Sequence, residues 1–435
     1  MSRSCTSASR CRRHASCGWP PRPGSRAKAL KIAVIGGGWA GLAAAVELTA
    51  AGAQTTLFEA GRVLGGRARG VEIDGRQLDN GQHILLGAYR DTLALMSRVG
   101  ADPDQLFDRR PLQVVDNTGF RLALPRLPAP LNVAWGLLRA SGVSLGEKLR
   151  TALWMDGIKR RGFKLPGETT VAEWLDAACQ TGALRRHLWE PLCLAALNIP
   201  AERASAQLFA NVLRDSLGSS RREDTDLLLP RVDLGQLLPE PAGRWLHTHG
   251  AQIRLSTRVS EIAEAENGIA IDGETFSAAV IATAPQHVGA LWPAAATNYA
   301  YEPIATVYRN FVPKMKSPFP LSNRLGDHCQ WVVDRGQAVQ ACVLSGHGDW
   351  EKLDDAALVA ALDAELGLPN PTGWHKVIRE KRATFSAIPG LHRPDFKTSN
   401  PRLVLAGDYT WADYPATLEG AVRSGLRAAR QVVRG

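Results

Sequence analysis

"GGGWAGLAAAVELTAAGAQTTLFEA", Gly36 to Ala60, is the stretch that decides the fold of this chain. A short β-branched run, Lys31–Ile35, stops at the glycines, and the alanine- and leucine-rich segment Ala40–Ala51 follows with helical composition. Gly52 is typical of a helix C-terminus, and Thr55–Glu59 has the composition of a second strand. The stretch therefore predicts a strand–turn–helix–strand unit.

The glycines of this unit have the spacing of a dinucleotide-binding turn. Gly36 permits the tight turn, Gly38 lets the backbone approach a pyrophosphate, and Gly41 lets the helix pack closely on the strand. The helix N-terminus offers N–H groups to phosphates, and Glu59 is placed to accept the hydroxyls of an adenosine ribose. The alternative is a glycine-rich turn without a ligand, but the strand, the helix and the acid together favour a Rossmann-like α/β domain.

The next segment separates FAD from NAD. "GRVLGGRARG", Gly61–Gly70, contains the pair Gly65 and Gly66, followed by Arg67. It resembles the segment after the second strand in the superfamily of FAD-dependent amine oxidases and phytoene desaturases. That resemblance implies FAD as the cofactor, with the glycine pair near its flavin side and Arg67 near its phosphates. A basic surface loop is the alternative for this segment taken alone.

The C-terminal segment resembles the second half of the same cofactor site. Arg402–Val433 predicts a strand, a Gly-Asp pair, a loop and a helix that opens near Leu418. In the superfamily this element closes over FAD, with the Asp on the ribityl or pyrophosphate region and the helix N-terminus facing the flavin ring. Carried onto this chain, the implied contacts are Gly407, Asp408, Glu419, Gly420 and Ala421.

A third block, Ile253–Pro285, predicts hairpin turns at Asn267–Gly268 and Asp272–Gly273. The apolar run Ala278–Ala284 predicts a parallel strand buried on both faces. The superfamily places a backbone contact to the adenine in this block, at the position of Val259.

The predicted FAD-binding domain is therefore discontinuous and comprises residues 31–123, 245–285 and 401–435. Residues 124–244 and 286–400 are predicted to form an inserted α+β substrate domain with a helical lid. A chain of 435 residues is long enough for two such cores.

The net charge of +10 does not indicate a nucleic-acid-binding domain. Residues 1–30 contain seven basic residues and no acidic one, so the rest of the chain carries only +3. This serine-, arginine- and proline-rich leader is expected to be disordered. A transit peptide and a start codon placed too far upstream are both consistent with its composition.

Other classes of protein are disfavoured by what the sequence lacks. The sequence contains no run of eighteen uncharged apolar residues, so it predicts no membrane-spanning helix. The cysteines are scattered without metal-ligand spacing, so we expect no metal and buried thiols in a reducing cytoplasm.

The first insertion carries an unusual apolar and basic segment. Leu131–Val143 presents leucines and a tryptophan among basic residues, a pattern that suits contact with a membrane surface. The alternative is a set of ordinary core-facing helices in the lid domain. Further on, Trp189–Asn198 resembles the pocket helix of carotenoid desaturases, which suggests a large lipid-like substrate.

One segment points to a single family within this superfamily: "LDNGQHILLGAYRDTL", which begins at Leu78. Together with the cofactor motifs and "AGDYT" near the C-terminus, it resembles the family of hydroxysqualene dehydroxylases over residues 31–435. That family implies the reduction of hydroxysqualene, a C30 isoprenoid alcohol, to squalene by hydride from reduced FAD, in squalene and hopanoid biosynthesis. The cysteine usage and the Leu131–Val143 segment together give the hypothesis of a cytoplasmic protein with peripheral contact at the inner face of the membrane.

Loss of a hydroxyl group requires a proton donor in a water-poor pocket. The candidates by position are Asp79, His83, Tyr409 and Asp413. His83 is the first choice because imidazole titrates near neutral pH, and Asp79 would orient it. The alternatives are that Asp79 and His83 hold the isoalloxazine or cap a helix, and that Tyr409 packs in the core.

Two other functions remain open from the sequence. A carotenoid desaturase would run the hydride in the opposite direction, and a prenyl-binding escort protein of the same fold would lack FAD. The complete dinucleotide fingerprint argues against the escort protein. The chain has one such fingerprint and does not identify the electron donor for FAD.

Overall fold

The computed structural model describes residues 30–116, 118–310, 321–323, 328–336, 339–366 and 373–434. The predicted disordered leader lies outside the described residues.

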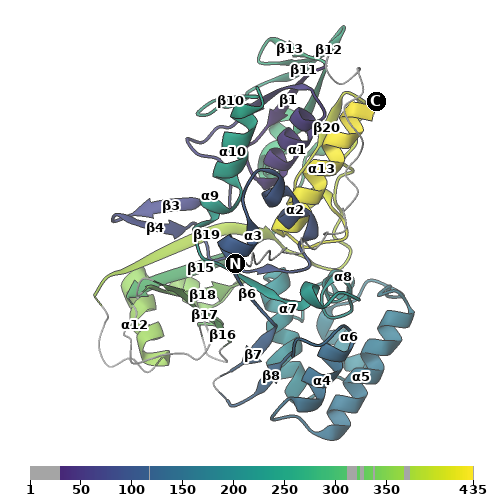
Figure 1. Cartoon of the computed structure of the whole chain (residues 1–435), viewed down its shortest axis with the longest axis vertical. Helices are drawn as coiled ribbons and strands as arrows, with labels where there is room; N and C mark the ends of the chain where they lie inside the picture. Colours follow the sequence, from purple (N-terminus) through teal and green to yellow (C-terminus); the bar gives the residue numbers. More distant parts are fainter. Residues whose placement is uncertain are drawn as a thin grey trace, which may run out of the picture.

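A five-stranded parallel sheet forms the upper part of the molecule (Figure 1). Its order is β10-β2-β1-β14-β20, with bounds Gln252–Arg254, Gln54–Phe58, Lys31–Ile35, Ala278–Ile281 and Leu403–Leu405. The central strand β1 buries Ile32 and Val34 in the core on one face and Ala33 and Ile35 in the core on the other. The apolar β-branched run is therefore explained by burial on both faces, and the predicted α/β fold is confirmed.

Helices α1 (Trp39–Ala50) and α13 (Leu418–Arg434) lie side by side on one face of this sheet (Figure 1). They approach closely at Gly425, where a Cβ would lie 2.1 Å from the carbonyl oxygen of Ala40. Helices α2 (Arg90–Arg98), α9 (Leu234–Leu237) and α10 (Pro239–Thr248) complete this layer. The other face is covered by the antiparallel strands β11 (Ile262–Ala265), β12 (Gly268–Ile271) and β13 (Glu274–Phe276).

A second, antiparallel sheet has the order β16-β17-β18-β15-β19. The bounds of its strands are Leu321–Asn323, Trp331–Gly336, Val339–Ser345, Tyr301–Asn310 and His375–Phe385. Helix α12 (Asp355–Glu365) packs on one face, and the hairpin of β3 (Gly70–Ile73) and β4 (Arg76–Asp79) packs on the other. The segment Gly70–Asp79 has strand-like composition on both sides of Asp74 and Gly75, whose φ angles of 53° and 71° turn the chain back into a hairpin.

A helical unit forms the lower right part of the molecule (Figure 1). It contains α4 (Leu131–Arg139), α5 (Leu145–Arg160), α6 (Val171–Ala177), a π-helical turn (Arg185–Trp189), α7 (Glu190–Leu197) and α8 (Ala206–Asp215). Its core includes a group of aromatic rings from Trp154, Trp174 and Trp189. The two-stranded sheet of β7 (Gln113–Val115) and β8 (Arg121–Ala123) packs against the same core.

The remaining sheet and helices connect these parts. They are β5 (Leu85–Leu86), β6 (Phe107–Arg110), β9 (Leu227–Pro230), α3 (Pro103–Leu106), α11 (Pro285–Leu291) and 3-10 turns at Arg222–Thr225, Pro293–Ala295, Asp349–Lys352 and Asp408–Thr410.

Candidate active site

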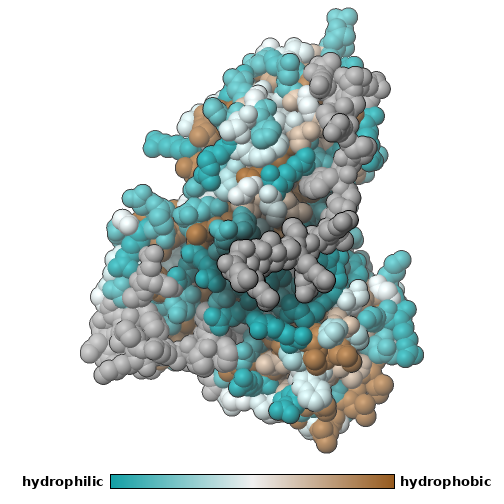
Figure 2. Space-filling model, in the orientation of Figure 1, coloured by the Kyte–Doolittle hydropathy of each residue, from teal (hydrophilic) through white to brown (hydrophobic). Residues whose placement is uncertain are grey.

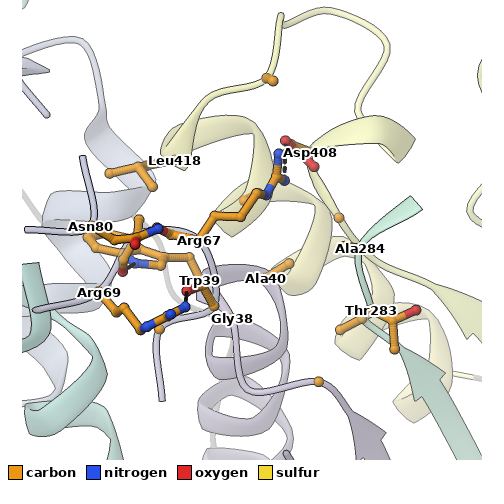
Figure 3. A pocket seen from close by; sticks show the side chains of 18 of the residues that line it. Gly38, Trp39, Ala40, Arg67, Arg69, Asn80, Thr283, Ala284, Asp408 and Leu418 are labelled. Atoms are coloured by element: carbon orange, nitrogen blue, oxygen red, sulfur yellow. Dashed lines mark hydrogen bonds and ion pairs between the residues drawn. The ribbon is translucent and has the colours of Figure 1, made fainter. Parts of the chain in front are cut away.

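A cavity of about 800 Å³ lies between the parallel sheet, the antiparallel sheet and the helical unit, and we call it the large cavity. Its walls come from the carboxyl ends of β1, β2 and β14, the N-terminal ends of α1 and α13, and strands β15 and β19. Ligands of open α/β sheets bind at this end of the strands. Figure 3 shows side chains from several of these elements around the cavity.

The turn between β1 and α1 has the geometry that its glycines predict. Gly36 has a φ of +110°, and a Cβ there would lie 2.6 Å from the carbonyl oxygen of Ala282. A Cβ on Gly41 would lie 1.8 Å from the carbonyl oxygen of Gly36, so only glycine fits behind the turn. Gly38 precedes α1 and lines the cavity. The turn therefore leaves the positive end of α1 uncovered toward the cavity.

Glu59 lies in the cavity wall at the end of β2. One carboxylate oxygen accepts a hydrogen bond from the N–H of Gly37 and the other from the N–H of Gly61, each at 2.6 Å. Each oxygen has a further lone pair for a hydroxyl donor. The contact with the ribose stays a prediction, and these lone pairs suit it.

The glycine pair brings a second loop against the turn. Gly65 donates its N–H to the carbonyl oxygen of Gly37 at 2.8 Å. Gly65 and Gly66 have φ angles of +112° and +61°, and a Cβ on Gly66 would lie 3.2 Å from the Cα of Gly38. Two backbone segments without side chains therefore meet at the edge of the cavity.

Arg67 joins the two ends of the chain across the cavity (Figure 3). Its guanidinium donates to Asp408 Oδ2 at 2.7 Å and to the carbonyl oxygen of Ala383 at 2.9 Å. Burial alone would lower the pKa of Arg67, but the Asp408 carboxylate raises it above its usual value. The pair therefore stays ionised and fixes the C-terminal segment against the Gly65–Gly66 loop.

Three further predicted contact residues line the large cavity, namely Val259, Gly407 and Ala421. Gly407 has a φ of +152° and donates its N–H to Ser424 Oγ at 2.8 Å. The structure thus places ten of the predicted cofactor-binding residues in the cavity wall: Gly36, Gly38, Glu59, Gly65, Gly66, Arg67, Val259, Gly407, Asp408 and Ala421.

Glu419 lies elsewhere, which corrects the predicted cofactor contact. Its side chain is fully buried, and one carboxylate oxygen accepts hydrogen bonds from the backbone N–H and the hydroxyl of Thr92 at 2.9 and 2.7 Å. The other accepts from the N–H of Asp91 at 3.1 Å and from Arg423 Nε at 2.8 Å. Glu419 therefore ties α13 to the N-terminus of α2 instead of facing the cavity.

Asp79 is also removed from the cavity. It is fully buried, accepts the N–H of Leu234 at 2.7 Å and forms an ion pair with Arg335 at 3.0 Å. Burial raises the pKa of Asp79 to about 6, although the Arg335 charge lowers it. Its predicted role in orienting His83 is therefore wrong, and its contacts hold the hairpin against the second sheet.

Two other candidate proton donors lie outside the cavity wall. Tyr409 is fully buried in the core on the face of the parallel sheet that β11–β13 cover, so the core-packing alternative applies to it. Asp413 is exposed, and its backbone carbonyl oxygen accepts a hydrogen bond from Asn211. Neither residue is among those that line the large cavity.

His83 is the one of the four candidates that lines the large cavity. Its Nδ1 lies 2.8 Å from the carbonyl oxygen of Gly81, so this nitrogen is the donor and carries the proton. Burial lowers the pKa of His83, and the positive charge of Arg67 lowers it further, against the Gly81 hydrogen bond. In the neutral ring, Nε2 is then a free acceptor.

A second cavity of about 200 Å³ adjoins the first, and we call it the apolar cavity. Its walls are mainly leucine, valine and alanine side chains from β7, α7, α8, β17 and β18, together with Trp331 and Tyr414. Helix α7 lies in this wall, as its resemblance to a pocket helix predicts.

The two cavities share part of their lining, and the shared residues mark their junction. The apolar members are Ile84, Ala195, Ala196 and Ile304. The polar members are Gln82, Tyr89, Asn198 and Thr417. Gln82 Oε1 is buried, and no described residue offers it a hydrogen-bond donor.

The junction and the carboxyl end of β14 are parts of the site that were not predicted from the sequence. Gln82 belongs to the "DNGQH" motif, so its position in that motif was the available signal. Thr283 and Ala284 follow β14 and line the large cavity (Figure 3), as the rule for the carboxyl ends of parallel strands would have predicted. Tyr89 and Asn198 belong to the two segments quoted for their family resemblance, and the fold brings them to the junction at the N-terminal end of α2 and the C-terminal end of α7.

The large cavity fits a dinucleotide with a flavin. Its walls include glycine backbone at positions where a side chain would obstruct a ligand, and an uncovered helix N-terminus for a pyrophosphate. Thr283 Oγ1 is buried in this wall without a partner among the described residues. Gly38, Glu59 and Arg67 would hold the nucleotide and its phosphates.

Within the described ranges, no group of His, Cys, Asp and Glu side chains is arranged to hold a metal ion. The described helices include none that is long and apolar enough to span a membrane.

The comparisons with known proteins agree with this architecture. The model of the flavin containing amine oxidoreductase family matches residues 39–433. A putrescine oxidase structure has a TM-score of 0.66 at 16% identity and covers 93% of this chain and 99% of its own. An oxidoreductase from Methanosarcina mazei has a TM-score of 0.69 at 14% identity, with coverage of 92% and 100%. At these identities the likeness concerns the fold.

Curated relatives of higher sequence identity show which branch of the family the chain resembles. A hydroxysqualene dehydroxylase from Rhodopseudomonas palustris is 30% identical over 92% of this chain and 98% of its own length. One from Sinorhizobium fredii is 28% identical over 92% and 97%. A probable zeta-carotene desaturase from Synechococcus elongatus is 23% identical over 93% and 98%. The chain is therefore an FAD-dependent oxidoreductase that belongs to the flavin containing amine oxidoreductase family, in the branch of the hydroxysqualene dehydroxylases.

Proposed function

We propose that this oxidoreductase removes the hydroxyl group of hydroxysqualene to give squalene. The observation that carries the proposal is the contact between the large cavity and an apolar cavity through a junction at which polar side chains, Gln82 among them, meet the apolar wall. A C30 isoprenoid alcohol has one polar group on an otherwise apolar chain, which matches this arrangement. The names of the curated relatives support the same substrate.

In this proposal the apolar cavity holds the part of the isoprenoid chain next to the reacting carbon and excludes water from it. Gln82 Oε1, which lacks a donor among the described residues, accepts a hydrogen bond from the substrate hydroxyl at the junction. The rings of Tyr89, Trp331 and Tyr414 line the same space and would stabilise positive charge on an allylic carbon.

The reaction replaces a C–O bond by a C–H bond. The hydroxyl group leaves with one proton as water, and a hydride takes its place on the carbon. Reduced FAD, when bound, supplies that hydride. His83 is the side chain proposed to deliver the proton, with Gly81 in place of Asp79 as the group that orients the ring.

The test is a single-turnover reaction with the purified flavoprotein, photoreduced without oxygen and mixed with hydroxysqualene. We expect squalene, detected by mass, in step with reoxidation of the flavin absorbance. Gln82→Leu should slow this reaction while the flavin spectrum stays unchanged. A flavin that stays reduced beside intact substrate would reject the proposal.

The second candidate function is carotenoid-type desaturation, favoured by the likeness to the zeta-carotene desaturase. In that case oxidised flavin would be bleached by a polyene substrate and would not respond to hydroxysqualene. Because either substrate partitions into lipid, we propose that the protein acts in the cytoplasm at a membrane surface. The electrons for FAD would come from a separate donor.

A further inference from the structure

Exposed apolar side chains are concentrated on one face of the helical unit. Ten large hydrophobic side chains are exposed among the described residues, and seven of them lie between residues 127 and 153. Figure 2 shows this concentration as the brown area at the lower end of the molecule, over α4 and α5 of Figure 1. We call these seven residues the leucine face: Leu127, Leu131, Trp135, Leu138, Leu145, Leu149 and Leu153.

Helix α4 presents its apolar side to solvent. Leu131, Trp135 and Leu138 are exposed by 59%, 48% and 55%. The buried side contains Asn132 and Gly136, where a Cβ would lie 2.4 Å from a side-chain carbon of Leu124. Val133 and Leu137 pack on the core beside them, so α4 carries an exposed apolar row in addition to the core-facing side chains of a usual amphipathic helix.

Helix α5 has an apolar row that the fold does not use. Leu145, Leu149 and Leu153 follow one another at a spacing of four residues, which places them on one side of the helix. They are exposed by 75%, 63% and 64%, whereas Thr151 and Ile158 are buried on the opposite side. Lys148 Nζ donates to the carbonyl oxygen of Leu138 at 2.8 Å, so the two helices lie together.

The charges around the leucine face are mostly positive. Residues 124–164 contain eight basic and two acidic residues. Of the two acids, Glu147 accepts the N–H of Leu184 inside the unit, and Asp156 forms an ion pair with Arg160. The exposed basic residues around the face include Arg126, Arg139, Arg150, Lys159, Arg161 and Lys164.

The same helical unit forms part of the apolar cavity. Leu112, Val114, Leu188 and Val212 line that cavity and belong to the core against which α4 and α5 pack. A surface that binds lipid would therefore sit on the unit that receives a lipid-like substrate.

We propose that the leucine face docks on the surface of a bilayer containing anionic lipids, with its leucines in the acyl boundary and its basic residues on the headgroups. The row of apolar side chains would enter the interface, and the surrounding positive charge selects anionic lipid. This inference rests on the proposed function only for the nature of the substrate, because the docking surface stands on exposure and charge.

The experiment is flotation of the full-length holoenzyme with vesicles of phosphatidylglycerol and phosphatidylethanolamine, compared with vesicles of phosphatidylcholine alone. We expect flotation with the anionic vesicles and a loss of bound protein at high salt. The combined variant Leu145→Ser, Leu149→Ser and Leu153→Ser should lower the partition coefficient by about tenfold or more. The combined variant Arg139→Gln, Lys159→Gln and Arg161→Gln should weaken binding to the anionic vesicles and leave binding to the phosphatidylcholine vesicles unchanged.

A matched control is the pair Leu255→Ser and Ile388→Ser, two exposed hydrophobic residues outside the leucine face that should leave flotation unchanged. Equal flotation of the wild type and the leucine variant would overturn the inference. So would a wild-type protein that stays with neither vesicle. A wild-type dimer in sedimentation that the leucine variant converts to a monomer would also overturn it, since the face would then bind a second copy.

Activity separates this inference from the proposed function. The leucine variant should convert substrate dissolved in detergent micelles as the wild type does, and should be slow with substrate held in vesicles. A wild type that floats but converts no substrate in either form would reject the function and leave the docking surface standing.

Discussion

Glu59 shows how a single side chain can prepare a ligand site. Its two carboxylate oxygens already hold the N–H groups of Gly37 and Gly61, so its position at the cavity is set before any ligand arrives. A pre-oriented acceptor loses less conformational entropy when a hydroxyl group binds.

We expect Glu59→Gln to weaken FAD binding by roughly tenfold to a hundredfold, because hydrogen bonds to a charged acceptor contribute about 1.5–3 kcal/mol. The measurement is FAD titration of the apoprotein by flavin fluorescence. Glu274→Gln, which removes a carboxylate paired with Lys31 and Arg254 away from the cavity, is the control and should bind FAD normally.

The pH dependence of turnover should report His83. Its pKa is lowered by burial, so the ring is mainly neutral at pH 7 and gains its proton only as the pH falls below its ordinary value of 6.5. If it delivers the proton, kcat should rise as the pH falls through that region. His83→Gln should remove this rise while FAD remains bound; a wild-type profile that is flat or falls toward acid would contradict the role.

At the residue scale, the sequence correctly predicted the positions at which the backbone geometry admits only glycine. Gly36 and Gly41 were predicted because no other residue fits there. Glu419 and Tyr409 were misplaced because an acid at a helix start, or an aromatic after Gly-Asp, has the same local sequence in a ligand site and in a core. Only the tertiary position of α2 showed that Glu419 is a buried tie between helices.

At the scale of elements, the close packing of α1 on α13 depends on Gly425. A methyl group there would lie 2.1 Å from the carbonyl oxygen of Ala40, which is rigid backbone. The helices would have to separate, and α13 carries the Ala421 end of the large cavity.

We predict that Gly425→Ala lowers the free energy of unfolding by about 1–3 kcal/mol and weakens FAD retention. The measurements are urea denaturation and the ratio of flavin to protein after gel filtration. Gly157→Ala in α5 is the control, because the nearest atom to its Cβ is the end of Arg161, 3.9 Å away. That variant should be neutral or more stable by up to about 1 kcal/mol.

Helices and strands were predictable where the pattern or composition of apolar residues favours one kind of secondary structure. The two-sided burial of β1 gave a continuous apolar run, and α1 followed from its composition. In Gly70–Asp79 both arms of the hairpin carry strand-like residues, and Asp74–Gly75 between them is a turn signal that the structure bears out. For the segment of α4 the sequence allowed two interpretations, a surface that contacts a membrane and a helix that faces the core. Each is correct for some of its residues, because Val133 and Leu137 pack inward while Leu131 and Leu138 are exposed.

At the scale of the whole molecule, two cavities formed by different parts of the chain meet at one junction. Ala195 and Ala196 of α7 lie at that junction because the helical unit is inserted beside the cofactor-binding sheet. Small side chains there keep the passage open.

Ala196→Phe should therefore lower turnover of a C30 substrate by about tenfold or more, because the larger ring fills the passage. The flavin spectrum and FAD affinity should remain those of the wild type. Ala360→Phe on α12, an exposed alanine away from both cavities, should have no effect on kcat or KM. Loss of FAD from Ala196→Phe would show that the residue supports the cofactor site instead.

The ion pair between Arg67 and Asp408 joins positions that are 341 residues apart. On the ribosome, β1 and β2 emerge long before β14, β20 and α13, which complete the sheet and cover α1. The β1–α1–β2 unit of the nascent chain therefore exposes apolar surface until nearly the whole chain has been made. Exposed apolar surface of this kind is what chaperones bind. We therefore expect FAD to be captured only after synthesis of the chain is complete, and a nonsense codon that removes only α13 to leave a chain that is degraded by proteases.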